Sequence, residues 1–209
     1  MRFVRSALAA VLVVPIVLQA QAPADSLSLA GRSSFMVGLG LTGSKDASAT
    51  ASGAIVRASG EIGSLSFSHW VRSDVAAEIS AAVLGAGVSG GFGGFSANAS
   101  AITPILFGLS YSPRALALGT SLRPFVSAAA GPYIHMASGA RGSGADASTE
   151  AVPGARLGVG ANLFVSRHFM LAVTGDYNAV GRFSHVDAVS EHPSGFGMSL
   201  AFGVAWGGR

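Results

Sequence analysis

The chain has 209 residues, a length that suits one domain of ordinary size. Charged residues make up 11 % of it and hydrophobic residues 50 %, whereas about a quarter of the residues in soluble domains are charged. Past the N-terminus no apolar run reaches roughly 18 residues, which excludes a transmembrane helix. Cysteine is absent, so disulfides and thiol chemistry are excluded as well.

The N-terminal segment has the pattern of a secretory signal peptide. Arg2 and Arg5 precede the apolar stretch Ala7–Leu18, which is too short to span a membrane, and the small residues Ala20 and Ala22 follow it. Because a proline comes directly after Ala22, we expect cleavage after Ala20, with a cut after Ala22 as the alternative. Residues 1–20 are therefore predicted to be a signal peptide.

The remaining charge does not indicate a nucleic-acid partner. Loss of Arg2 and Arg5 reduces the basic residues from 13 to 11 against 10 acidic residues, which leaves a net charge near +1. No cluster of Lys and Arg occurs in the sequence, so we expect no nucleic-acid binding.

From Ser33 to Gly207 the sequence consists of strand-like runs in which large apolar residues occupy every second position. This period of two is typical of β-strands whose two faces lie in different environments. In chain order the runs are Phe35–Thr42, Glu61–Val71, Val75–Val83, Ile102–Tyr111, Arg123–Met136, Arg156–Val165, Phe169–Asn178 and Phe196–Trp206.

The gaps between these runs are alternately long and short. Short connections are predicted at Arg72–Asp74 and Ser166–His168, with a medium one at Ser112–Ser121. Long polar loops, rich in Gly, Ser and Ala, are predicted at Gly43–Ser59, Gly85–Ser100, Ala137–Pro153 and Gly181–Ser194. In an antiparallel barrel with an even number of strands, both termini and the short turns share one side. The termini are therefore expected to face the periplasm, and the long loops the outside.

Two all-β folds compete for this pattern. A soluble sandwich or lipocalin-like barrel places large residues inside and polar ones outside. Here one face is bulky throughout, and the other is mostly Gly, Ala and Ser, which fit the narrow lumen of an eight-stranded barrel. We therefore predict an eight-stranded antiparallel up-and-down transmembrane β-barrel over residues 33–207.

Aromatic residues and prolines refine this prediction. Aromatic residues near the ends of the runs are expected to form girdles at the membrane interfaces, namely Phe35, Tyr111, Phe169, Tyr177 and Trp206. Proline cannot donate a ladder hydrogen bond, so Pro104, Pro124 and Pro132 are expected at strand ends or bulges near the rims.

Two segments resemble a known family. Leu122–Tyr133 (LRPFVSAAAGPY) and Gly154–Asn178 (GARLGVGANLFVSRHFMLAVTGDYN) are similar to the bacterial outer-membrane β-barrel domain family of OmpA- and OmpX-like small barrels. The resemblance covers most of the chain after the signal peptide, and its motifs are those of a β-meander. It implies a protein of the outer membrane of a Gram-negative cell. One departure is that Gly207-Gly208-Arg209 follow Trp206, where such barrels often end on an aromatic residue.

Four charged residues are candidates for a network inside the barrel. Glu78, Arg156 and Asp176 lie on the small-residue face of their runs, and Arg123 is expected to join them. Charges in a narrow lumen need partners, because desolvation of an unpaired charge is costly. The first interpretation is an ion-pair network that orders and plugs the barrel. The alternative is a gate, in which rearranged pairs open a thin water path.

Two further patterns carry no assigned chemistry. Gly38-x-Gly40-x-x-Gly43 matches the dinucleotide fingerprint by letters, but it lacks the helix that would hold the phosphates. Ser, His and acidic residues gather in the last long loop, where they suggest a solvated loop rather than a hydrolase or a metal site. These residues are His185, Asp187, Ser190, Glu191 and His192. No catalytic residue, metal site or cofactor is predicted.

The sequence thus predicts an integral outer-membrane protein that is not an enzyme, with a structural or surface-interaction role carried by its outer loops. Expected partners are outer-membrane lipids, including lipopolysaccharide, the barrel-assembly machinery during insertion, and an unidentified extracellular ligand. A narrow channel for small solutes, gated by the lumen charges, is the alternative. An enzyme that modifies envelope lipids is the third possibility.

Overall fold

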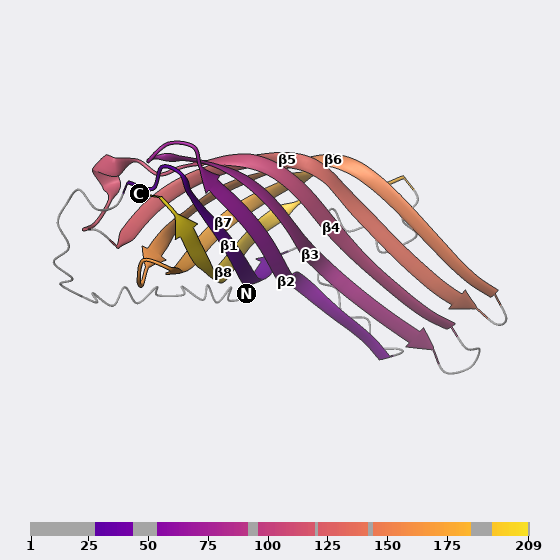
Figure 1. Ribbon diagram of the computed structural model, residues 1–209. Coiled ribbons are helices and arrows are strands. Elements are labelled where there is room, and N and C mark those ends of the chain that lie inside the picture. The colour runs from indigo at the N-terminus through magenta and orange to yellow at the C-terminus, as the bar shows by residue number, and fades with distance from the viewer. Residues whose placement is uncertain are drawn as a thin grey trace, which may run out of the picture.

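The computed structural model describes residues 28–43, 54–91, 96–119, 121–141, 144–184 and 194–208. Within them the chain forms a closed barrel in which each strand pairs with its sequence neighbours and β1 pairs with β8 (Figure 1). All pairings are antiparallel, so the predicted eight-stranded meander is confirmed. The strands are β1 (Arg32–Gly43), β2 (Ala54–Trp70), β3 (Val75–Gly91), β4 (Ser96–Tyr111), β5 (Leu122–Arg141), β6 (Gly144–Phe164), β7 (Phe169–Val180) and β8 (Gly195–Gly207).

One short 3₁₀ helix, η1 (Arg114–Leu116), lies in the connection between β4 and β5. In the part of the chain that the structure describes, no helix is long and apolar enough to cross a membrane. The predicted signal peptide, residues 1–20, lies outside the described residues.

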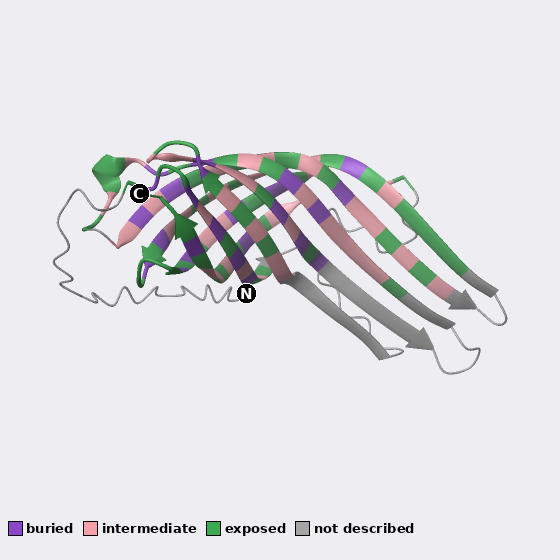
Figure 2. Cartoon of the chain, in the orientation of Figure 1, coloured by how far each residue is buried: buried purple, intermediate pink, exposed green. Residues whose placement is uncertain are grey.

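The period of two in the sequence places large apolar side chains on the outside of the barrel. Along β8 the outward side chains include Phe196, Leu200 and Trp206, which are 74 %, 58 % and 45 % exposed. Between them Gly197 and Ala205 are buried, and Figure 2 shows the same alternation of exposed and buried residues on neighbouring strands. The outside is thus a continuous apolar surface, the reverse of the arrangement in a soluble barrel.

Two of the predicted long loops are in fact strand. β3 continues to Gly91 and β4 begins at Ser96, within the expected loop Gly85–Ser100. β5 and β6 likewise pair in unbroken register from Pro132↔Pro153 to Arg141↔Gly144, within the expected loop Ala137–Pro153. A stretch of small and polar residues is typical of a loop. The hydrogen bonds between the two strands of a hairpin join backbone groups, however, and they also form where the side chains are small and polar. The loop predictions were therefore wrong over most of these two segments.

The other two loop predictions are tested only in part. β2 begins at Ala54, so the end of the expected loop Gly43–Ser59 is strand. Residues 181–184 and 194 lie outside any strand, as expected, and residues 44–53 and 185–193 are outside the described residues.

Five strands continue past the closed part of the barrel. The pairing of β6 with β7 ends at Gly154↔Val180, and residues 144–153 of β6 pair with β5 alone. At the opposite edge, the pairing of β1 with β2 ends at Gly38↔Ser64, while β2 pairs with β3 as far as Ala54↔Gly90. In the described residues, β2 to β6 therefore rise as an open sheet beyond the barrel mouth, visible as the long ends of these strands in Figure 1. We call this part the sheet extension.

The prolines lie mainly within strands. Pro124 is close to the start of β5, as expected, but Pro104 and Pro132 are internal to β4 and β5. The ladder between these two strands is interrupted after Pro104↔Tyr133 and resumes at Phe107↔Ala130. Proline thus interrupts a ladder here without ending a strand or shifting its register, and the prediction of strand ends or bulges near the rims was wrong for Pro104 and Pro132.

One glycine illustrates how closely the lumen is filled. Gly160 of β6 lies opposite Phe125 of β5, and a Cβ atom added to it would lie 2.3 Å from the carbonyl oxygen of Val173 and 2.7 Å from Cζ of Phe125. Both distances are well below van der Waals contact. The ring of Phe125 therefore covers a position that only glycine can occupy.

We predict that Gly160→Ala lowers the free energy of unfolding by about 1–3 kcal/mol, because the added methyl group overpacks the lumen. Gly175→Ala is the control, since its added Cβ would meet no other atom closer than 3.9 Å, and it should change stability by less than about 0.5 kcal/mol. Urea unfolding of the protein folded into lipid vesicles measures both values. An equal loss of unfolding free energy in Gly160→Ala and Gly175→Ala would contradict the close contact expected at Gly160.

Candidate functional site in the barrel lumen

The barrel encloses a polar cavity of about 90 Å³. Hydroxyl side chains dominate its lining because β2 and its neighbours carry Ser at alternate, inward positions. These are Ser34, Ser64, Ser66, Ser68, Ser80, Ser110, Ser127, Thr174 and Ser199. One water needs roughly 10–15 Å³ of such space, so the cavity has room for several waters.

An ion pair crosses this cavity from β6 to β3. Arg156 of β6 donates a hydrogen bond from Nη2 to the Oγ atom of Ser80 at 2.7 Å, and the same nitrogen lies 3.5 Å from Oε1 of Glu78. Glu78 and Ser80 are two residues apart on β3, so they share one face and are reached by one guanidinium. Both charged side chains are largely buried, with 16 % and 21 % of their surface exposed. The pair therefore links opposite walls of the barrel.

A second polar cluster lies beside the ion pair. The hydroxyl of Tyr133 donates to Oδ1 of Asn178 at 2.7 Å, and Nδ2 of Asn178 donates to Oδ1 of Asp176 at 3.3 Å. Asp176 also lines the cavity. Tyr133 is not among the residues that the sequence predicts for the lumen, because Pro132 and Pro124 obscure the alternation along β5.

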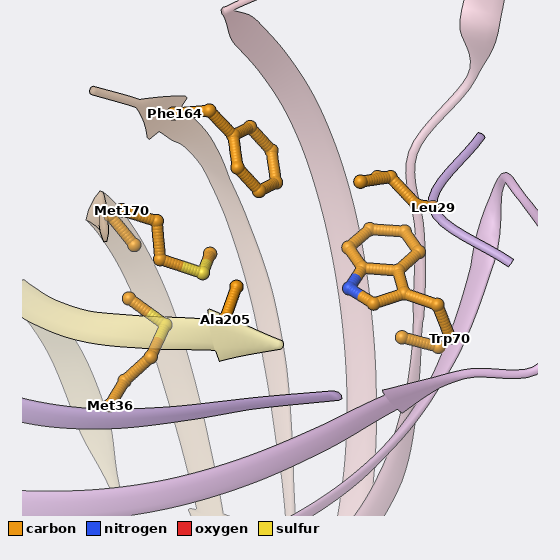
Figure 3. Close-up of a cluster of buried hydrophobic side chains, with 8 residues drawn as sticks. Leu29, Met36, Trp70, Phe164, Met170 and Ala205 are labelled. Atoms are coloured by element: carbon orange, nitrogen blue, oxygen red, sulfur yellow. The ribbon is translucent and has the colours of Figure 1, made fainter. Parts of the chain in front are cut away.

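Large apolar side chains close the end of the lumen that carries the short turns. Leu29 precedes β1 and is fully buried, and it packs with Trp70, Phe164 and Met170 (Figure 3). Two backbone hydrogen bonds fold the chain over the mouth, from the amide of Gly31 to the carbonyl of Trp70 at 2.8 Å and from Arg32 to Leu29 at 3.0 Å. We call this group, completed by Met36, Ala76, Ala172 and Ala205, the lower plug.

A second apolar group closes the lumen toward the sheet extension. Leu84, Leu106 and Tyr133 are almost completely buried there. We call this group, completed by Ala82 and Val152, the upper plug; Ile102, Ala129, Val180 and Phe183 pack against it. The polar cavity thus lies between two apolar closures, and apolar constrictions exclude water and ions.

An ion pair joins two of the four predicted lumen charges. The structure brings Glu78 and Arg156 together and places Asp176 on the same cavity. Arg123 is buried near the start of β5, opposite Asn162, and is not among the residues that line the cavity. His135 stacks on Phe183, with ring centroids 5.4 Å apart, beside the upper plug.

Three further predictions concern the last long loop, metal binding and the aromatic girdles. The five polar residues of the last loop, from His185 to His192, lie outside the described residues. Among the described residues, no group of three or more His, Asp or Glu could hold a metal ion. The predicted girdle aromatics point outward and are exposed; all but Tyr177 lie near the short turns.

Comparisons with known proteins agree on the fold. No family model and no curated protein matches the sequence. Among solved structures, Ail, the attachment invasion locus protein of Yersinia pestis, has a TM-score of 0.50 at 10 % identity, covering 85 % of this chain and 99 % of its own. A second Ail structure, in complex with the heparin analogue sucrose octasulfate, has a TM-score of 0.52 at 10 % identity, covering 85 % of this chain and 99 % of that one.

The outer membrane protein OprG of Pseudomonas aeruginosa has a TM-score of 0.51 at 12 % identity, covering 86 % of this chain and 97 % of its own. At such identities the likeness is one of fold. The chain has the fold of the small outer-membrane β-barrels, which confirms the fold that the sequence predicted.

We predict that Arg156→Met lowers the free energy of unfolding by about 1–3 kcal/mol, because it removes the positively charged partner of the largely buried Glu78. The double variant Glu78→Gln/Arg156→Met should recover part of this loss, since no unpaired charge remains. Urea unfolding in lipid vesicles supplies the double-mutant cycle. If the double variant loses as much unfolding free energy as Glu78→Gln and Arg156→Met lose together, the two residues are not coupled.

Proposed function

We propose that this protein is an integral outer-membrane barrel that presents its sheet extension at the cell surface, where it has a structural or surface-interaction role. The observation that carries the proposal is the combination of a closed lumen with strands that rise past the barrel on one side. Two apolar plugs seal the polar cavity, whereas β2 to β6 extend well beyond the last pairing with β7. The barrel serves as a support, and the extension offers the surface.

The outer face supports a membrane location. Large apolar side chains cover it on every strand, for example Leu65, Ile79, Phe107, Leu157 and Phe202, all of them exposed. An apolar belt of this kind suits the hydrocarbon region of a bilayer and would cause aggregation in water. The closed ring of strands satisfies its backbone without water, as a membrane requires.

The orientation follows from the connections. Three short connections lie at the end where the described chain begins and ends, and the extension lies at the other. Barrels of this class have short periplasmic turns and longer extracellular loops. Periplasmic termini and an extracellular extension are therefore part of the proposal, as is export by residues 1–20. Its partners in the membrane would be lipids, including lipopolysaccharide, and the barrel-assembly machinery.

The extension also suggests the kind of surface partner. Past β7 the amides of Gly181 and Ser184 donate to the carbonyl oxygen of Pro153 and to Oε1 of Glu150 on β6. Residues 144–149 of β6 pair with β5 alone in the described chain, and this stretch of edge suits an extended segment of a partner. Among the described residues of this end, three basic residues, Arg57, Arg141 and Arg182, stand against three acidic ones, Glu61, Asp146 and Glu150. Without an excess of positive charge, these residues favour a polypeptide partner over a sulfated saccharide such as the heparin analogue bound to Ail.

The proposed display is tested by epitope accessibility. A peptide tag inserted after Gly142, between β5 and β6, should bind antibody on intact Gram-negative cells. The same tag inserted after Ser73, in the turn between β2 and β3, should bind only after the outer membrane is permeabilised. Resistance of both proteins to carbonate extraction is the control for integration. Accessibility of the Ser73 tag alone on intact cells would overturn the orientation.

The channel is the second candidate, favoured by the hydroxyl-lined cavity and the ion pair within it. Because apolar plugs lie at both ends, we predict that the wild-type protein shows no steady conductance in planar bilayers. The double variant Leu29→Ser/Leu106→Ser, which places a hydroxyl in each plug, is expected to produce openings. Steady wild-type conductance that changes in Glu78→Gln would instead establish a channel gated by the lumen charges.

A further inference from the structure

Each of the three short connections carries one exposed arginine. Arg72 lies between β2 and β3, Arg114 in η1, and Arg167 between β6 and β7. Among the described residues of these connections Asp74 is the only acidic one, and it lies 3.8 Å from the highly exposed Arg72. A salt bridge this long and this exposed contributes little and leaves the guanidinium available. The end of the barrel is therefore ringed by positive charge.

These arginines stand next to lipid-facing side chains. Val71 precedes Arg72, and Val165 and Phe169 flank Arg167; all three apolar side chains are exposed. The connection between β4 and β5 also exposes Leu116 and Leu118, and η1 has no buried residue. Exposed leucines beside an arginine indicate contact with the interfacial region of a bilayer. The three guanidiniums are thus placed at the depth of the lipid headgroups.

Hydrogen bonds hold this ring in position. The guanidinium of Arg32 donates to the carbonyl oxygen of Arg167, and that of Arg114 donates to Oγ of Ser73 in the neighbouring turn. The amide of Ala205 donates to the carbonyl of His168 at 2.7 Å, which fixes the Arg167 turn to β8. The charges therefore belong to connections with defined positions on the barrel.

We propose that the end of the barrel with the short turns binds anionic phospholipid headgroups, such as phosphatidylglycerol, in the leaflet that it faces. Arginine suits this ligand because its planar donors match two phosphate oxygens at once. The excess of positive charge attracts a headgroup with a net negative charge over a zwitterionic one. By contrast, the described residues of the other end carry as many acidic as basic residues. This inference rests on the proposed membrane location.

The chain contains its own reporter for this interaction. Of its two tryptophans, Trp206 points outward near the end of β8, 6.2 Å from the ring of Phe67. It follows Ala205, to which the Arg167 turn is bonded. Trp70 is 3 % exposed and lies in the lower plug. Brominated lipids therefore quench Trp206 and leave Trp70 as a constant background.

The test reconstitutes the folded protein in phosphatidylcholine vesicles and compares quenching by brominated phosphatidylglycerol and brominated phosphatidylcholine. At low salt we expect roughly threefold preference for phosphatidylglycerol, weakening as the salt concentration rises. The triple variant Arg72→Gln/Arg114→Gln/Arg167→Gln should lose this preference. The matched variant Arg57→Gln/Arg141→Gln/Arg182→Gln, at the other end, should keep it, and lysine at the first three positions should keep part of it.

Equal quenching by both lipids in the wild type would overturn the inference. An equal loss of the preference for phosphatidylglycerol in the two triple glutamine variants would also overturn it. Retention on purified peptidoglycan that depends on the three arginines, without any lipid preference, would assign the ring to a different partner and also overturn it. Heat-modifiable migration of every variant reports folding separately. Failure of the wild type to insert into vesicles would count against the proposed function, whereas insertion without lipid preference would count against this inference alone.

Discussion

The structure depends on the pairing of the first strand with the last. β1 pairs with β8 along its whole length, from Arg32↔Gly207 to Gly43↔Phe196. In the interior of a bilayer no water is available for an unpaired backbone group, so a sheet can cross only if it has no free edge. This pairing removes both edges of the sheet over the closed part of the barrel, which is the part proposed to face lipid. Past that part the constraint ends, and there the strands β2 to β6 continue as an open sheet.

Closure with eight strands also determines what the lumen can hold. The interior is only wide enough for side chains, and at Gly160 even a methyl group would collide with Val173 and Phe125. One guanidinium, that of Arg156, is long enough to cross from β6 to Ser80 and Glu78 on β3. The remaining cavity is small, and the hydroxyls around it can be satisfied by several waters. A polar interior of this kind is compatible with a stable plugged barrel.

The sequence predicted the features that depend on local alternation. A period of two is visible in any single strand, so the strands, their outward faces and the inward positions of Glu78, Arg156 and Asp176 could be derived residue by residue. The extent of the hairpins could not be derived in this way, because Asp146 is a strand residue only through its pairing with Gly139 of the neighbouring strand. The lower plug was missed for a related reason. Leu29 and Phe164 are far apart in sequence, and their contact exists only once the barrel has closed.

The two ends of the barrel differ in every property that bears on function. At the short-turn end Leu29 and Trp70 seal the lumen, and the connections are short, basic and bordered by exposed apolar residues. Such an end suits a fixed position in a lipid leaflet. At the other end the strands leave the barrel, and among the described residues 144–149 of β6 pair with β5 alone. The charges of the described residues are balanced there. Because apolar plugs close the lumen between them, the two ends are separate surfaces. In the proposed orientation the short-turn end would hold the barrel at its depth in the membrane, and the sheet extension would meet what lies outside it.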